Sequence, residues 1–223
     1  MTLACSPAEK YTEPAASEAI VSFTPGNLAA LIIAASFSAG LNTYATLLTL
    51  GLAAHTRWVQ LPPGLEVVGN WWVIGVCSVL FLAEFIADKV PTLDVAWNAL
   101  HTVVRIPVAA LLAYRATEHL TPPMQIAAIA AGAAIAALAH TSKTALRVAV
   151  TPSPEPFSNI ALSSTEDVAA VGLTWLATSH PWLSASIVLV LLGIALFAIR
   201  WVIRLFRRAF RSGVAALPQP PMP

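Results

Sequence analysis

The sequence has 223 residues, of which 57% are apolar and only 10% are charged, and its mean hydropathy is +0.74. Soluble domains carry about 25% charged residues and about 45–50% apolar ones. The composition therefore excludes a disordered chain, a nucleic-acid-binding protein and an ordinary cytosolic enzyme. Because a spanning helix needs about 20 mostly apolar residues, the sequence predicts a small polytopic protein of the lipid bilayer.

Taken in chain order, the sequence predicts a transmembrane domain between two polar ends. A polar leader covers residues 1–26, the transmembrane domain covers residues 27–211, and a proline-rich tail over residues 212–223 is expected to be disordered. Proline-containing breaks divide the domain into six apolar segments, at about Leu28–His55, Asn70–Lys89, Val95–Thr117, Met124–Val150, Ser158–Ser179 and Trp182–Leu205. The predicted fold class is all-α, a bundle of about six transmembrane helices.

The first predicted helix contains a cluster of small and hydroxylated residues over positions 36–43. Such residues let neighbouring helices approach closely and form hydrogen bonds across the interface. The same cluster could instead mark a broken helix that lines a cavity. Both interpretations remain open.

The basic residues predict how the bundle is oriented, because cytoplasmic loops of membrane proteins carry an excess of Lys and Arg. With six spans and both termini in the cytoplasm, the outer side holds only Arg57 and Arg115. The tail-proximal arginines could also bind anionic lipid headgroups at the inner leaflet, although orientation alone explains them. They are Arg204, Arg207, Arg208 and Arg211.

Two parts of the sequence resemble each other and predict an internal two-helix repeat. The copies cover about residues 62–117 and 122–179, and each begins with a proline pair. Aligning them places Arg105 opposite Asp167, and a weaker third copy falls at Asn42. Chance similarity is the alternative, because alanine and leucine are common here. A true repeat would favour a transporter, whose sites often lie at repeat interfaces.

Polar and ionisable side chains inside the predicted spans are the candidate functional residues, because burying a charge in lipid costs roughly 2.5–3.5 kcal/mol. Arg105 lies near mid-helix and must have an acidic partner, for which Glu166 and Asp167 are the expected candidates. One of these two carboxylates is expected to face the bundle while the other points away. The full set is Asn42, Glu84, Asp88, Asn98, His101, Arg105, His140, Lys143, Arg147, Asn159, Ser163, Glu166 and Asp167.

Some members of this set also have plain structural explanations. Asp88 could be an interfacial end-cap, and His140, Lys143 and Arg147 could be a positive-inside anchor. Buried ion pairs can fix helix register without adding stability. The sequence therefore allows a small transporter or permeation pathway for an ion, proton or small polar solute, or alternatively a structural or assembly protein.

Motifs for nucleotide binding and for catalysis are absent from the sequence, and its two cysteines have no metal-ligand spacing. We therefore expect no cofactor, no metal and no enzymatic activity, and an intramembrane enzyme is the least favoured hypothesis. The expected partner is the lipid bilayer, the sequence leaves open an assembly with further copies of the chain, and nucleic acid is not expected.

Three stretches carry a resemblance to a known family. They are Ser38-Ala39-Gly40-Leu41-Asn42-Thr43-Tyr44-Ala45-Thr46, Glu84-Phe85-Ile86-Ala87-Asp88-Lys89-Val90-Pro91 and Ser153-Pro154-Glu155-Pro156-Phe157-Ser158-Asn159. Together they resemble a bacterial membrane family described only as domain of unknown function 4126, over about residues 28–205. The resemblance implies a multi-pass protein of the bacterial inner (plasma) membrane and implies no activity.

Overall fold

The computed structural model describes residues 24–89, 91–150 and 156–215, and this part of the chain is helical without strands. It confirms the all-α prediction. Six of the helices begin at a proline, whose fixed φ suits the first helical position and whose missing N–H is not needed there. The elements are α1 (Pro25–Leu41), α2 (Thr43–His55), η1 (a 3-10 helix, Pro63–Gly69), α3 (Trp71–Ala87), α4 (Pro91–Ala116), α5 (Pro122–Val150), α6 (Pro156–Ser179) and α7 (Pro181–Ala215).

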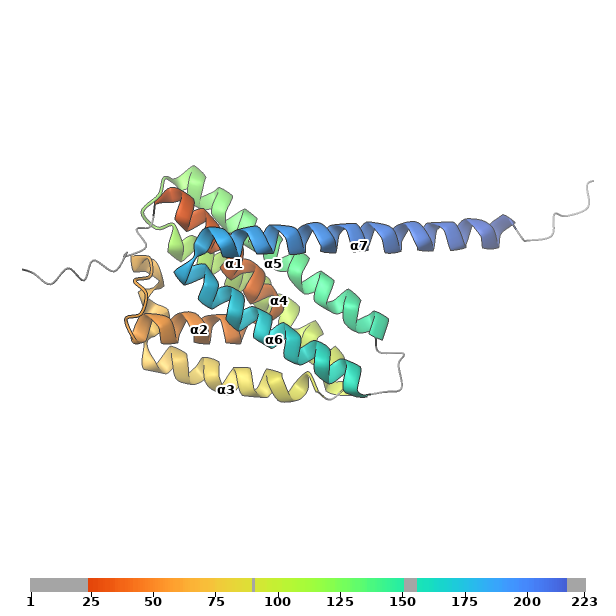
Figure 1. The fold of residues 1–223 in the computed structure, drawn as a ribbon, viewed down its shortest axis with the longest axis horizontal. Helices are drawn as coiled ribbons and strands as arrows, with labels where there is room; N and C mark the ends of the chain where they lie inside the picture. The colour runs from red at the N-terminus through yellow and green to blue at the C-terminus, as the bar shows by residue number, and fades with distance from the viewer. Residues whose placement is uncertain (1–23, 90, 151–155, 216–223) are drawn as a thin grey trace, which may run out of the picture.

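Helices α3 to α7 run back and forth between two ends of the molecule (Figure 1). The tryptophan end, where α1, α3, α5 and α7 begin, carries four exposed tryptophans: Trp58, Trp71, Trp72 and Trp182. The arginine end lies opposite and is named for the exposed Arg200, Arg204 and Arg207 of α7, which projects beyond the other helices there (Figure 1). Exposed tryptophans at one end are typical of a membrane–water interface.

The first predicted helix is wrong as a single helix, because it breaks at Asn42 and turns back. Both outer ends of the pair lie at the tryptophan end (Figure 1). There the Asn27 side chain accepts a hydrogen bond from Trp182 at 2.8 Å, and the His55 ring lies 4.2 Å from the Trp71 ring. Helices α1 and α2 therefore form a hairpin, called the re-entrant pair below, whose tip at Asn42 lies inside the bundle.

The helix can break at Asn42 because the backbone and side chain of this residue form hydrogen bonds with both α1 and α2. Its backbone is extended (φ −147°, ψ 105°), its N–H still donates to Ser38 O, and its side-chain oxygen accepts from Ala45 N at 2.9 Å as the N-cap of α2. Its carbonyl accepts from Thr46 N. Asparagine is among the best N-cap residues, so this one residue satisfies backbone groups that a break would otherwise leave without partners.

Close packing against α5 holds the end of α1 in place. A Cβ atom at Gly40 would lie only 2.6 Å from the backbone oxygen of Ala136 and 2.7 Å from the Cβ of Ala139. Only glycine fits at this contact. The close-packing interpretation of positions 36–43 is therefore confirmed, and the helix is also broken at Asn42.

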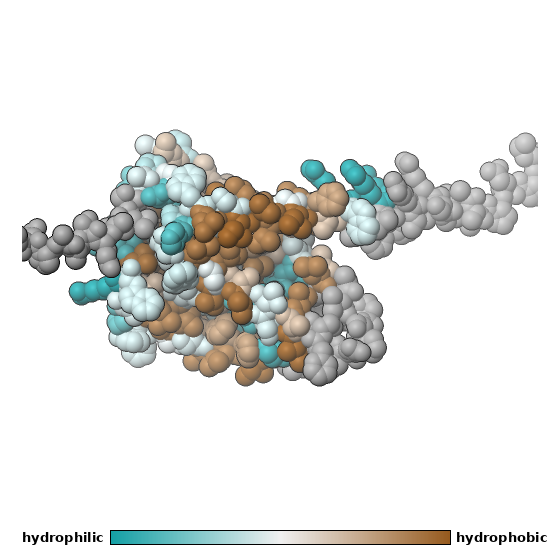
Figure 2. Space-filling view, viewed as in Figure 1, coloured by the Kyte–Doolittle hydropathy of each residue, from teal (hydrophilic) through white to brown (hydrophobic). Residues whose placement is uncertain are grey.

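The outer surface of the molecule carries many large apolar side chains, while several charged side chains are buried inside it. Figure 2 shows apolar surface over the first half of α7 and along the edge formed by α3. Val79 of α3 and Ile194 of α7 are about two-thirds exposed, whereas Glu84, Arg105 and Asp88 are fully buried. This distribution suits a protein surrounded by lipid.

By length and composition, three helices in the described part could cross a membrane, in α4, α5 and α7, and a fourth if η1 and α3, bent by 64°, count as one span. The predicted ends of α3 to α6 agree with the structure within four residues. Helix α7 continues ten residues beyond the predicted end, into the expected tail, and η1 was not predicted. The internal repeat stays a prediction, but the first of the six predicted spans is replaced by α1 and α2, which turn back at Asn42. Residues 1–23 of the leader and 216–223 of the tail lie outside the described residues.

Candidate functional site

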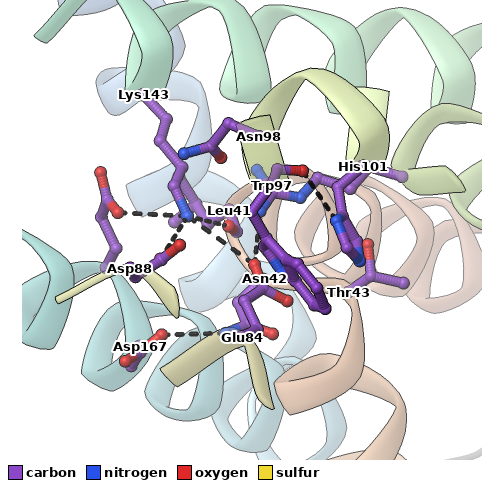
Figure 3. Close-up of polar contacts among 12 residues, drawn as sticks. Leu41, Asn42, Thr43, Glu84, Asp88, Trp97, Asn98, His101, Lys143 and Asp167 are labelled. Carbon is purple, nitrogen blue, oxygen red and sulfur yellow. Dashed lines mark hydrogen bonds and ion pairs between the residues drawn. The ribbon is translucent and has the colours of Figure 1, made fainter. Parts of the chain in front are cut away.

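The ammonium group of Lys143 lies at the centre of a buried polar cluster at the tip of the re-entrant pair (Figure 3). Its Nζ donates to the backbone oxygen of Leu41 at 3.1 Å and to Asp88 Oδ2 at 3.2 Å. Glu166 Oε2 lies 3.2 Å away and Glu84 Oε1 lies 3.9 Å away. Four elements of the fold therefore meet at one cation.

Helix direction explains why Lys143 binds at this carbonyl. The carbonyl of Leu41 is at the last residue of α1, where the aligned peptide dipoles leave partial negative charge. A normal helix would satisfy such carbonyls with its next turn, but the chain becomes extended at Asn42. The break thus leaves a hydrogen-bond acceptor in the interior, and Lys143 of α5 donates a hydrogen bond to it.

Arg105 of α4 pairs with Glu84 of α3, and neither side chain is exposed. Its Nη1 also donates to His140 Nδ1 at 2.8 Å, and His140 Nε2 lies 2.7 Å from Thr102 Oγ1. The Thr102 hydroxyl donates its hydrogen to the Asn98 carbonyl, so it must accept from His140. These roles require a neutral His140 with its proton on Nε2.

His101 has the opposite tautomer. Its Nδ1 lies 2.8 Å from the carbonyl oxygen of Trp97, which can only accept, so Nδ1 carries the proton. Nε2 then accepts from the Tyr44 hydroxyl at 3.0 Å. Because Tyr44 is the second residue of α2, this bond ties the start of α2 to α4, and the Trp97 ring stacks on His101 (Figure 3).

Asp167 of α6 forms a hydrogen bond with Asn42 at the tip of the re-entrant pair. The side-chain amide of Asn42 donates to Asp167 Oδ1 at 2.9 Å (Figure 3). Among the described side chains, Asp167 forms no ion pair within 4 Å, in contrast to Glu84, Asp88 and Glu166. Its second oxygen, Oδ2, is buried and accepts no hydrogen bond from the described residues.

The structure corrects three expectations about these residues. Arg105 pairs with Glu84 and His140, not with Glu166 or Asp167, because α3 rather than α6 brings a carboxylate to its guanidinium. Glu166 and Asp167 are both buried, since α6 packs against α1 and α2 on one side and α5 and α7 on the others. Asp88 is the C-cap of α3, but it is buried and pairs with Lys143 instead of lying at an exposed interface.

His140 and Lys143 are likewise buried and paired, so they are not a solvent-facing positive-inside anchor. Asn98 and Ser163 are buried on α4 and α6. The side chains of Arg147 and Asn159 lie outside the described residues. In the described part of the chain, no group of three or more His, Cys, Asp or Glu side chains could hold a metal ion.

Sequence reasoning missed Tyr44 and the carbonyl of Leu41. A signal for both was present, because an asparagine after a glycine and a leucine in an apolar segment can begin a new helix. Once the break is recognised, the residue before Asn42 has an unsatisfied carbonyl and Tyr44 lies in the first turn of α2. The sequence left a broken helix open as an alternative, and both residues gain their roles only because the break lies at Asn42.

The cluster can do two things chemically. Its carboxylates, carbonyl, amide and imidazoles can bind and pass protons or cations, or its closed ion pairs can lock α1 and α3 to α6 in one arrangement. No cofactor is needed for either.

Comparisons with known proteins identify the family of the chain. A family model described as Domain of unknown function (DUF4126) matches residues 29–201, which agrees with the resemblance found in the sequence. No curated protein and no solved structure matches the chain. The match covers the whole charged cluster and all but the first four residues of the re-entrant pair, and the chain belongs to the DUF4126 family.

Proposed function

We propose that the protein is a small membrane transporter or permeation pathway for an ion, a proton or a small polar solute. The site is the Lys143 cluster together with the tip of the re-entrant pair. The observation that carries the proposal is the helix break at Asn42, which lies against Lys143 and Asp167 inside the bundle.

Broken helices at membrane depth are tolerated where protein or a cavity surrounds them, and transporters use their half-helix ends to bind ions. Here the end of α1 offers the Leu41 carbonyl to a cation, and the start of α2 faces Asp167 through the Asn42 cap. A purely structural bundle needs no such break, because a continuous helix satisfies its own backbone. The break therefore favours a binding role over a packing role.

The proposed setting is the bacterial inner membrane, with the arginine end in the cytoplasm because cytoplasmic segments carry the excess of basic residues. The expectation that both termini are cytoplasmic depended on one helix from Leu28 to His55. With the re-entrant pair, the start of α1 lies at the tryptophan end, opposite the end of α7. We therefore place the start of α1 on the outer side.

One observation favours the alternative of a structural or assembly protein. Glu84, Arg105, Lys143 and Asp88 have no exposed side-chain surface, and the described ion pairs join them into a closed network. Such a network can fix the arrangement of helices without any transported species.

Proteoliposome flux separates the two functions. Purified protein is assayed over a panel of ions, protons and small polar solutes, and wild type is compared with Asn42→Ala and with Asn70→Ala. Asn70 is also a helix N-cap, at the exposed start of α3, so it is a matched control. Flux that Asn42→Ala abolishes and Asn70→Ala preserves supports transport. A correctly folded wild type without flux for every tested species supports the structural alternative.

A further inference from the structure

We propose that Asp167 is a proton-binding site whose protonation weakens the attachment of the re-entrant tip to α6, so that the ion handled by the protein is a proton. This inference rests on the proposed function and names its ligand. It starts from the charges that surround Lys143.

The described part of the cluster contains more carboxylates than cations. Glu84, Asp88, Glu166 and Asp167 face Arg105 and Lys143, and all are nine-tenths buried or more. Uncompensated charge is costly in a protein interior, so this environment favours uptake of positive charge. A proton is the smallest cation available, and it needs no cavity.

Asp167 is the one carboxylate of these four that forms no ion pair among the described residues. Lys143 lies within 4 Å of each of the other three, and Arg105 also pairs with Glu84. Asp167 receives only a neutral amide from Asn42 among the described residues, and its Oδ2 is buried without a hydrogen-bond partner there. On the same face of α6, one turn earlier, the Ser163 hydroxyl is also buried without a described partner.

Among the side chains that the structure describes, the titratable groups of the neighbouring helices do not supply the missing partner. From α5 there are His140 and Lys143, both already bonded, and from α2 there is Tyr44, which bonds to His101. Helix α1 has no titratable side chain, and α7 has none before the exposed Arg200. Glu84 and Asp88 at the end of α3, and Glu166 beside Asp167, add further negative charge.

Proton binding at Asp167 would change the hydrogen bond that holds the tip. A proton from bulk water joins Oδ2, the carboxylate becomes a neutral carboxylic acid, and the formal charge of the cluster rises by one. Hydrogen bonds to ionised groups are roughly twice as strong as those between neutral groups. The Asn42–Asp167 bond is therefore stronger without the proton, and the proton loosens the tip.

Infrared spectroscopy of the full-length protein in liposomes tests the site directly. At about pH 6 exposed Asp and Glu are ionised, so a C=O stretching band of a protonated carboxylic acid that shifts in D2O reports a buried acid. We expect this band in wild type at about pH 6, a smaller band at about pH 9, and its loss in Asp167→Asn. Glu166→Gln is the matched control, because Glu166 lies next to Asp167 in the sequence and pairs with Lys143. This variant should keep the band.

A wild type without the band at about pH 6, a band of unchanged size at both pH values, or a band that Asp167→Asn leaves intact overturns the proposal. A band lost in Glu166→Gln alone overturns it too. A wild type that lacks the band, or whose band does not change with pH, overturns the proposal even where a variant fails to fold. A band that follows the expected pattern in protein without any flux upholds the proton site and refutes transport. Flux of another solute through protein that lacks the band supports transport and refutes the proton site.

Discussion

Arg105 and Glu84 form a fully buried ion pair that joins α4 to α3, 21 residues apart in the sequence. Its counterpart at the surface, Arg115 with Glu118, is more than one-third exposed on both sides. Removing one partner of a buried pair leaves an uncompensated charge, which costs about 3–5 kcal/mol. We therefore expect Arg105→Ala to lower the free energy of unfolding in detergent by about this amount.

The surface pair provides the control for that measurement. Solvent screens an exposed pair and the flexible side chains lose entropy in forming it, so Arg115→Ala should leave the unfolding transition nearly unchanged. A double-mutant cycle over Glu84 and Arg105 should give a large coupling energy. Equal effects of Arg105→Ala and Arg115→Ala would contradict the buried pair.

Replacing Gly40 should disturb helix packing, whereas replacing glycines at open helical positions should not. Gly40→Ala brings its Cβ within 2.6 Å of the Ala136 oxygen, whereas a Cβ at Gly75 or Gly193 meets nothing within 4 Å. Overpacking costs about 1–3 kcal/mol, but alanine at an open helical site is favoured by up to about 1 kcal/mol over glycine. Gly40→Ala should lower the thermal transition, and Gly75→Ala and Gly193→Ala should leave it equal or higher. Similar shifts in all three would refute the close contact between α1 and α5.

Part of this architecture was predictable because lipid imposes simple rules. Apolar runs between prolines predicted α3 to α6 closely, and the cost of charge in lipid singled out Glu84 and Arg105 as buried. The partner of Arg105 was not predictable, because a repeat alignment relates equivalent positions and does not say which side chains touch. The sequence alone also could not decide whether the chain turns at Asn42. A capping side chain competes with a continuous helix, and contacts such as Gly40 with α5 decide between them.

The two buried histidines should differ in tautomer. Hydrogen-bond roles place the proton of His140 on Nε2 and that of His101 on Nδ1. Imidazole 15N chemical shifts distinguish the two forms, and solid-state NMR of protein in liposomes measures them. We expect two distinct neutral signals, assigned by His140→Gln and His101→Gln. The same tautomer at both positions, or a charged imidazole at His140, would contradict the chain from Arg105 to Thr102.

The re-entrant pair makes a topological prediction that a single spanning helix does not. In a variant without native cysteines, Asn27→Cys and Arg57→Cys should react with a membrane-impermeant thiol reagent from the same side of the membrane. Arg207→Cys should react from the opposite side, because α7 carries it to the arginine end. Labelling of right-side-out and inside-out vesicles measures this. A single helix from Leu28 to His55 would instead place positions 27 and 57 on opposite sides. The comparison between these two positions needs no assumption about which side is cytoplasmic, so it tests the turn at Asn42 separately from the orientation.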